Sequence, residues 1–190
     1  MKRRVFSGFR SDEDGSMAVE FVLMLPMLIW ALGALYVYVA VFQVRETATK
    51  ATYTIADLYS RQTDPVDQSF VDQTGNVLAF LAGQGASPAM RVSVIHCAAD
   101  CDMPDRTLAL DWSAGTTGVA GLTEAALGAS GIAARVPTIG LGDRVIVVET
   151  RFPFVPPLGF GLPPQLFETM MITPPRFAPQ LCWETCASGG

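Results

Sequence analysis

The strongest constraint in the sequence is an apolar run from Phe21 to Phe42, 22 residues without a charged or amide side chain. As a helix rising about 1.5 Å per residue, this run would span roughly 33 Å, enough for a hydrocarbon core of about 30 Å. It is longer than the apolar core of a cleaved secretory signal, which is about 7–15 residues, and no small-x-small cleavage site directly follows Phe42. The sequence therefore predicts a retained transmembrane helix over residues 16–43.

The charges on the two flanks of this run predict its orientation. The first ten residues hold four cations, whereas the flank after the run holds only Arg45 and Lys50. Because cytoplasmic flanks carry the excess of Lys and Arg, residues 1–15 are predicted to be a basic leader in the cytoplasm. The expected protein is single-pass in the cytoplasmic (inner) membrane, with its C-terminal domain in the periplasm or another extracytoplasmic space.

The overall charge argues against nucleic acid as a partner. The chain has 190 residues and a formal net charge of −5. Beyond the first ten residues it has no cluster of Lys and Arg. A surface that binds phosphates needs such a cluster, so nucleic-acid binding is not expected.

Glu20 stands immediately before the apolar run and has two interpretations. The carboxylate can mark the cytoplasmic interface and stay solvated. Alternatively, it belongs to the membrane segment, where an ionisable group tends to have a partner and a function. Charge and spacing alone leave both interpretations open.

A short motif around Glu20 carries a resemblance to a known family. The stretch Gly15–Phe21 (GSMAVEF), followed by Val22–Pro26 (VLMLP), resembles the N-terminus of TadE-like (TadE/TadF/TadG) pilus assembly proteins. These are pseudopilins of the tight-adherence, or Flp-type, pilus system. The family pattern is a glycine, four residues, a glutamate, an aromatic residue and an apolar helix with an early leucine-proline. Residues 10–45 match it well, and residues 48–58 also look like members of this group.

This resemblance implies a processing event and a set of partners. A prepilin peptidase would cut after Gly15, so that Ser16 becomes the N-terminus and Glu20 the fifth residue, followed by Phe21 where relatives often have tyrosine. In pilins this glutamate is thought to pair with the free amine of a neighbouring subunit inside the membrane. The implied partners are other pilin-like subunits, the assembly machinery and the lipid bilayer. The length of 190 residues resembles the minor type of subunit rather than the shorter major pilins.

The helix is expected to continue beyond the membrane as a stalk over residues 44–62. Apolar residues recur there at helical spacing, and a continuous helix from about Ala18 to Ser60 is predicted, with a local disturbance at Pro26. A break follows, in which Asp64 caps a helix that has Pro65 at its first position. Apolar residues between Phe70 and Leu81 mark this second, shorter helix, with Gly75 as a point of interruption.

The remainder is predicted to be an α+β domain over residues 63–190, built on a mainly antiparallel sheet. Four segments have strand character, namely residues 90–97, 107–112, 143–154 and 167–173. In the second of them Leu108, Leu110 and Trp112 share a parity, which predicts a common face. The last two strands are joined by a connection too short for a crossover helix, so they should be antiparallel. A weak helix is expected within residues 122–134.

The four cysteines fall in two closely spaced pairs, Cys97 with Cys101 and Cys182 with Cys186. An even count in an oxidising compartment predicts two disulfides, but three pairings are possible and the sequence does not choose between them. A zinc site made of all four thiolates is the competing interpretation, since its ligand spacing of about two to four residues is compatible. The expected compartment favours disulfides.

The sequence offers little for catalysis, and we predict no enzyme, no cofactor and no metal site. His96 is the only histidine; Asp100 and Asp102 lie nearby, but a lone histidine at a strand end is usually a surface or core residue. No Gly-x-Ser-x-Gly element supports a Ser-His-Asp triad. A group of aromatic residues lies among prolines near the C-terminus and fits either core packing or a subunit contact. These residues are Phe152, Phe154, Phe160 and Phe167.

These observations predict a structural or assembly component of a Flp-type pilus, either a minor pseudopilin or a membrane-anchored assembly factor. Small residues in the apolar run would permit close helix packing in lipid. They are Ala31, Gly33, Ala34 and Ala40. The alternative is a single-pass, membrane-anchored extracytoplasmic binding module unrelated to pili.

Overall fold

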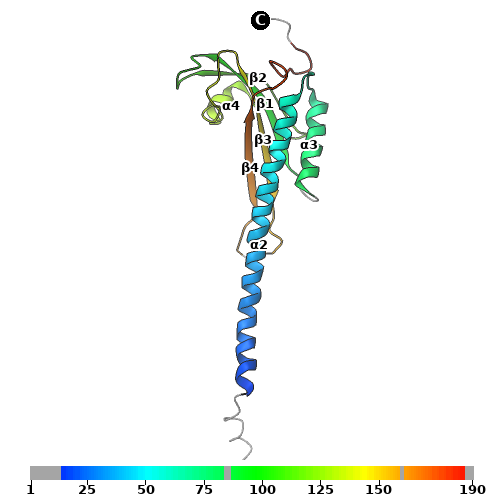
Figure 1. The fold of residues 1–190 in the computed structure, drawn as a ribbon, viewed down its shortest axis with the longest axis vertical. Helices are drawn as coiled ribbons and strands as arrows, with labels where there is room; N and C mark the ends of the chain where they lie inside the picture. Colours follow the sequence, from blue (N-terminus) through cyan, green and yellow to red (C-terminus); the bar gives the residue numbers. More distant parts are fainter. Residues whose placement is uncertain (1–13, 84–86, 159–160, 187–190) are drawn as a thin grey trace, which may run out of the picture. The chain divides into compact units, whose positions relative to one another are not determined.

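The computed structural model describes residues 14–83, 87–158 and 161–186, and these fall into two compact units (Figure 1). The first unit holds the N-terminal helix up to Phe42 together with the segment Pro156–Pro163. The second holds Gln43–Val155 and the chain from Pro164 onward. The predicted α+β class is confirmed, because one long apolar helix is combined with a small antiparallel sheet.

Helix α2 is a single helix of 48 residues, Asp14–Arg61. It contains the whole predicted apolar run and continues through the predicted stalk, so the expectation of one unbroken helix is confirmed. Pro26 lies inside it, and the chain stays helical on both sides of this residue. The predicted stalk is not a free spacer. Its buried residues Ala48, Ala51 and Ile55 belong to the core of the second unit.

The sheet has four strands in the order β2-β1-β3-β4, and every neighbouring pair is antiparallel. Its strands are β1 (Ala89–Ala99), β2 (Thr107–Gly115), β3 (Arg144–Phe154) and β4 (Gln165–Thr173). The prediction that the last two strands pair antiparallel is therefore confirmed. The two inner strands, β1 and β3, are the most buried ones, as their nearly continuous apolar sequences require.

One face of the sheet packs against the C-terminal part of α2 and against α3 (Gln68–Ala82). On α2 the buried positions 48, 51, 55, 56 and 59 follow the helical repeat and include three alanines, which let the helix approach the sheet closely. Ile146, Val148 and Phe152 of β3, which share a parity, point to this face. Inside this core the hydroxyls of Thr52 and Thr150 lie 2.6 Å apart in a buried hydrogen bond.

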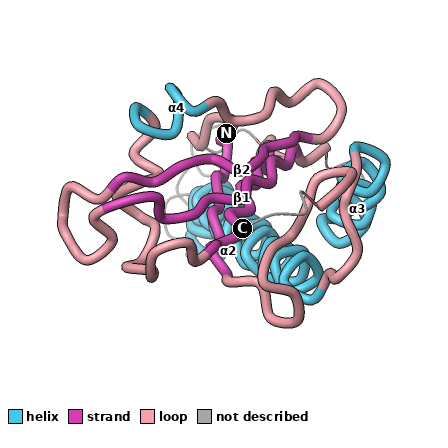
Figure 2. The backbone as a smooth tube through the Cα atoms, turned by 90° about the horizontal axis from the view of Figure 1, so that it is seen from above, coloured by secondary structure: helices cyan, strands magenta, loops and turns pink. Residues whose placement is uncertain are grey.

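The opposite face of the sheet is covered by the segment between β2 and β3. This segment contains the short helix α4, Glu124–Ala129, where a weak helix was expected. Its apolar residues form a second cluster with the alternate positions of the inner strands. The members of this cluster are Ile95, Leu122, Leu127, Ile132, Val136, Val145 and Val147. Figure 2 shows α4 on one side of β1 and β2 and α2 on the other. Each face of the sheet therefore carries its own apolar cluster.

The prediction that Leu108, Leu110 and Trp112 share one face is wrong for Trp112. In the pairing of β1 with β2, Val94 lies opposite Trp112 whereas Ile95 lies opposite Leu110. Asp111 is thus an extra residue in β2, and a bulge of this kind turns the side chains beyond it to the other face. Consequently Leu108 and Leu110 pack in the cluster on the face covered by α4. Trp112 packs in the core on the face covered by α2.

The second helix begins later than predicted. Its N-cap is Asp67, whose carboxylate accepts a hydrogen bond of 2.8 Å from the Phe70 N–H, and not Asp64. The reason is a long-range contact, since Val66 is held extended by a parallel bridge to Trp183. Gly75 does not interrupt the helix. A Cβ at this position would lie 2.5 Å from a methyl carbon of Thr116, so the glycine permits close packing.

Candidate functional site: the apolar length of helix α2

From Met17 to Leu32, α2 exposes large apolar side chains on all of its sides, and beyond Leu32 one of its faces is shielded. Of its most apolar 18-residue stretch only 6% is buried. A helix that is apolar all round normally lies buried in protein or in lipid. The helix is long and apolar enough to cross a membrane. Its exposed large apolar residues include Met17, Val19, Phe21, Val22, Leu23, Met24, Met27, Leu28, Ile29, Trp30, Leu32, Leu35, Tyr36, Tyr38 and Phe42.

The predicted processing residues lie at the start of this helix. Gly15 and Ser16 fall in the first turn of α2, which begins at Asp14. Glu20 and Phe21 follow one turn later, both exposed, with Phe21 at 63%. Within the described chain, no cation or hydrogen-bond donor pairs with the Glu20 carboxylate. The predicted basic leader lies almost entirely outside the described residues. The site is thus a helical carboxylate at the edge of an apolar surface.

The small residues of the apolar run do not share one environment. Ala31 is exposed, whereas Gly33, Ala34 and Ala40 are half-buried and lie on the same helical face as Val37, which is only 1% exposed. The described segment that groups with this part of the helix is Pro156–Pro163, the loop between β3 and β4 (Figure 1). Three of the four small residues therefore lie on the shielded face of α2 and not on its open faces.

The C-terminal disulfide joins Cys182 to Cys186 and closes a small loop in the second unit. The N–H of Val66 donates to the Cys182 carbonyl at 2.9 Å. The indole N–H of Trp112 donates to the Leu181 carbonyl at 2.7 Å, and the rings of Trp112 and Trp183 are 5.1 Å apart. These contacts hold the bridged loop and the residues before α3 against the core.

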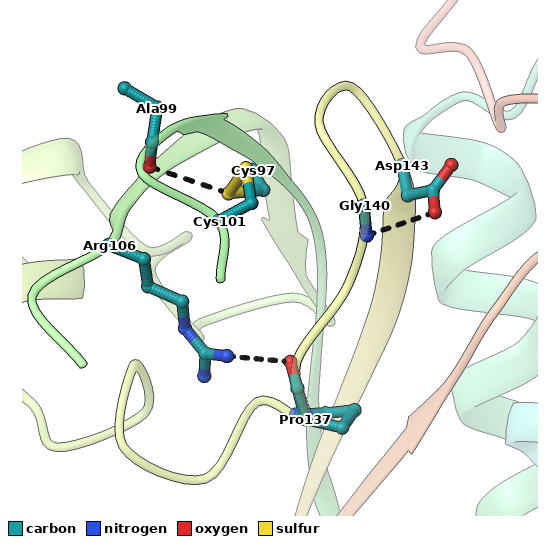
Figure 3. Close-up of a disulfide and its surroundings, with 7 residues drawn as sticks. All are labelled: Cys97, Ala99, Cys101, Arg106, Pro137, Gly140 and Asp143. Atoms are coloured by element: carbon teal, nitrogen blue, oxygen red, sulfur yellow. Dashed lines mark hydrogen bonds between the residues drawn. A yellow bond between two sulfur atoms is a disulfide. The ribbon is translucent and has the colours of Figure 1, made fainter. Parts of the chain in front are cut away.

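The other disulfide, between Cys97 and Cys101, closes the turn after β1 (Figure 3). Nearby, the Arg106 guanidinium donates to the Pro137 carbonyl at 3.0 Å and also to the carbonyls of Ala133 and Val136. Arg106 thus ties the segment after α4 to the β1–β2 turn. No pattern in the sequence indicated this role, because the partners are backbone carbonyls about thirty residues away. Both sulfur pairs are the nearest-neighbour pairing among the three that the sequence left open.

We expect each disulfide to contribute about 2 kcal/mol to the free energy of unfolding, from the chain entropy of its small loop. Replacing Cys182 and Cys186 together by alanine should lower that free energy by this amount, measured by urea unfolding followed by tryptophan fluorescence. The pair Cys97 and Cys101 is a matched comparison, because both bridges have a sequence separation of 4. An unchanged unfolding midpoint in both double variants would contradict a structural role for the bridges.

His96 belongs to a polar cluster on the sheet. Its Nδ1 lies 2.6 Å from a carboxylate oxygen of Asp111, at ion-pair distance but without hydrogen-bond geometry. The other oxygen of Asp111 accepts a hydrogen bond of 2.8 Å from Arg144 Nε. Asp111 is the bulged residue of β2, so the bulge directs its carboxylate between these two partners. Among the described residues no group of three His, Cys, Asp or Glu side chains is placed to hold a metal ion.

A hollow of about 470 Å³ lies beside the β1–β2 turn. Its lining includes one carboxylate, Asp102, and the Arg106 side chain, whose guanidinium is occupied by the three carbonyls described above. The rest of its lining is Met103, Pro104, Leu108, Ala133, Ala134 and Thr138. Apart from Asp102, Thr138 and the occupied Arg106, this lining is apolar. The exposed helix is the stronger candidate site.

The aromatic residues near the C-terminus are core residues where the structure describes them. Phe152 and Phe154 are 2% and 6% exposed, and Phe154 lies 6.0 Å from Phe167 between ring centroids. Phe167 packs against the core below α2. Phe160 lies outside the described residues. Core packing, one of the two interpretations from the sequence, therefore accounts for these three side chains.

No protein-family model, no curated protein and no solved structure matches this chain. What the chain does must therefore follow from its own residues, above all from the apolar length of α2 and the carboxylate of Glu20.

Proposed function

We propose that this chain is a membrane-anchored structural or assembly subunit of a Flp-type pilus, resembling the TadE-like minor pseudopilins. One observation carries the proposal. A single helix presents an exposed apolar surface from Met17 to Phe42 with an exposed carboxylate, Glu20, at its start, whereas its C-terminal part packs on an antiparallel sheet. The motif Gly15–Phe21 also supplies a candidate peptidase site directly before the apolar helix, where the leader of such a subunit would be removed.

The membrane and orientation in this proposal follow from burial, charge and cysteine chemistry. The exposed surface of α2 would be costly in water and favourable in lipid, at about 25 cal/mol per Å² of apolar area. The four cations of the first ten residues favour a cytoplasmic N-terminus. Two disulfides with no free cysteine fit an oxidising, extracytoplasmic compartment for the sheet.

In the proposed mechanism Glu20 orders neighbouring subunits. Cleavage after Gly15 would leave a free ammonium at Ser16, one helical turn away from Glu20. Because like-oriented helices stand side by side, that ammonium can meet the Glu20 carboxylate of a neighbour. The pairing would offset the desolvation of both charges in lipid, and the positive end of the helix dipole favours a carboxylate there. The assembly would need no catalytic residue in this chain.

The proposal is tested by the mass of the N-terminal peptide of membrane-extracted protein, with and without the prepilin peptidase of the system. We expect a mature chain that begins at Ser16 when the peptidase is present. In its absence, or in the variant Gly15→Leu, residues 1–15 should be retained. The matched control is Gly8→Leu, which alters the other glycine of the leader and should leave cleavage unchanged.

A chain that keeps residues 1–15 in every case would overturn the pseudopilin mechanism. It would leave the alternative, a membrane-anchored binding module that uses α2 only as an anchor. The same extraction separates the two ideas from a third outcome. If the protein leaves the membrane fraction at high pH or high salt, α2 does not span a bilayer and both ideas are overturned.

A further inference from the structure

The loop between β3 and β4 has an unusual composition for a loop next to an exposed helix. From Phe152 to Phe167 the chain carries no charged residue, and four of the residues in this stretch after Phe154 are prolines. The described residues of this loop in the first unit are Pro156–Leu158 and Gly161–Pro163. They belong to the same unit as the part of α2 that ends at Phe42. Loops that face only water are normally polar, so the composition of this one calls for a different neighbour.

We propose that this loop rests in the interface of the extracytoplasmic bilayer leaflet, beside α2, with Leu158 directed at the lipid. The inference rests on the proposed function, because it requires that α2 spans the membrane. It adds a second membrane contact that the apolar run by itself does not supply. The partner is the lipid surface, where headgroups meet acyl chains.

The first argument is the level of the helix beside which the loop lies. The shielded face of α2 in this unit centres on Val37, which is 1% exposed. Along the helix Val37 lies about 26 Å from Glu20, at a rise of about 1.5 Å per residue. If Glu20 marks the cytoplasmic edge of a hydrocarbon core about 30 Å thick, Val37 stands just inside its outer edge. The described part of the loop belongs to the same unit as this shielded face, so on this placement it would meet the bilayer at this level.

The second argument is an aromatic belt at the same level of the helix. Tyr36 and Tyr38 flank Val37 and are exposed, at 59% and 56%. Tyrosine is enriched at membrane–water interfaces, where its ring is in apolar surroundings and its hydroxyl reaches water. The two exposed tyrosines and the distance from Glu20 are independent observations. Both put the outer membrane interface at the turn of α2 that contains Val37.

The third argument concerns the backbone of the loop. An irregular loop in hydrocarbon would leave N–H groups without partners, which lipid does not tolerate. Pro156, Pro157 and Pro163 have no N–H, so this cost is reduced in the described part of the loop. The side chains fit the same environment, since Leu162 is half-buried and Leu158 is 45% exposed. A loop of this kind suits the headgroup boundary rather than the bilayer centre.

The test uses three matched leucine-to-cysteine variants of the full chain, each labelled with an environment-sensitive fluorophore. All four native cysteines are in disulfides, so each variant has one reactive thiol. The variants are Leu158→Cys in the loop, Leu28→Cys in the apolar helix and Leu141→Cys, an exposed leucine before β3. They are reconstituted in vesicles of phosphatidylcholine and phosphatidylglycerol that carry a nitroxide quencher near the headgroup or near the acyl-chain end.

We expect the label at Leu158→Cys to lose emission with the shallow quencher more than with the deep one. The label at Leu28→Cys should show the reverse preference, because Leu28 lies about 12 Å along the helix from Glu20, near the bilayer centre. The label at Leu141→Cys should keep its emission with both. Quenching at Leu28→Cys with none at Leu158→Cys would overturn the loop contact and leave the spanning helix. No quenching at either would overturn membrane insertion itself, and equal quenching at Leu158→Cys and Leu141→Cys would overturn a specific role for the loop.

Discussion

Replacing Ile55 by alanine should lower the free energy of unfolding by about 2–5 kcal/mol, the usual cost of a buried isoleucine-to-alanine change. Ile55 is fully buried and belongs to the core that joins α2 and α3 to the sheet. The loss has two parts, the lost burial of the side chain and the cavity left behind. The cavity should relax little, because the surrounding α2 positions are small alanines that cannot move inward to fill it.

This change is measured by urea unfolding of the full chain in detergent micelles, followed by tryptophan fluorescence. Trp112 and Trp183 report on the core, as their rings lie 5.1 Å apart beside the C-terminal disulfide loop. The matched control is Ile29→Ala, the same substitution in the same helix at a position that is 59% exposed. Equal midpoints for the two variants would show that the C-terminal part of α2 is not packed as described.

The second large effect is a loss of stability at high pH that depends on Tyr59. Burial raises the pKa of Tyr59 from 10.0 to about 12, with a smaller contribution in the same direction from Asp72 and an opposing one from the hydrogen bond to Thr74. The hydroxyls of Tyr59 and Thr74 lie 2.8 Å apart in the core. The folded state therefore holds the phenolic proton more tightly than the unfolded state does.

The direction of the effect follows from proton linkage. Below pH 10 both states are protonated and the full stability is present. Between pH 10 and 12 the unfolded state loses its proton first, so the free energy of unfolding falls as the pH rises. Once the pH has passed through the folded pKa, the total loss is about 3 kcal/mol.

The pH effect is checked by urea midpoints measured from pH 8 to pH 12 in the same micelles. The variant Tyr59→Phe should be less stable by about 1 kcal/mol at neutral pH, since it leaves the Thr74 hydroxyl without its tyrosine partner. It should also lack the decline that Tyr59 causes above pH 10. A decline of the same size in the variant would show that Tyr59 is not its cause.

These two effects concern the part of α2 on which the proposed function depends. One helix serves two purposes, because its N-terminal part has open apolar faces and its C-terminal part is built into a domain core. In the proposed assembly, Glu20 would order the helices, and the packed residues around Ile55 would make each helix inseparable from its own domain. A variant that unfolds the core should therefore also fail in assembly, even though its membrane segment is unchanged.

The sequence by itself determined the features that depend on local pattern. The apolar run predicted the long helix, the strand character of residues 143–154 predicted β3, and the short connection before β4 predicted antiparallel pairing. These signals are visible in one segment at a time, because helical and strand periods are properties of neighbouring residues. The motif around Glu20 is also local, although its role in processing remains a prediction.

Only the tertiary structure decided the features that depend on distant residues. Trp112 lies on the opposite face from the predicted one because Asp111 is an extra residue in the pairing of β2 with β1. The N-cap of α3 is Asp67 and not the predicted Asp64 because Val66 pairs with Trp183. The disulfide pairing likewise requires knowing which sulfur atoms meet. Each of these outcomes is set by register or contact between segments, which side-chain periodicity within a segment does not encode.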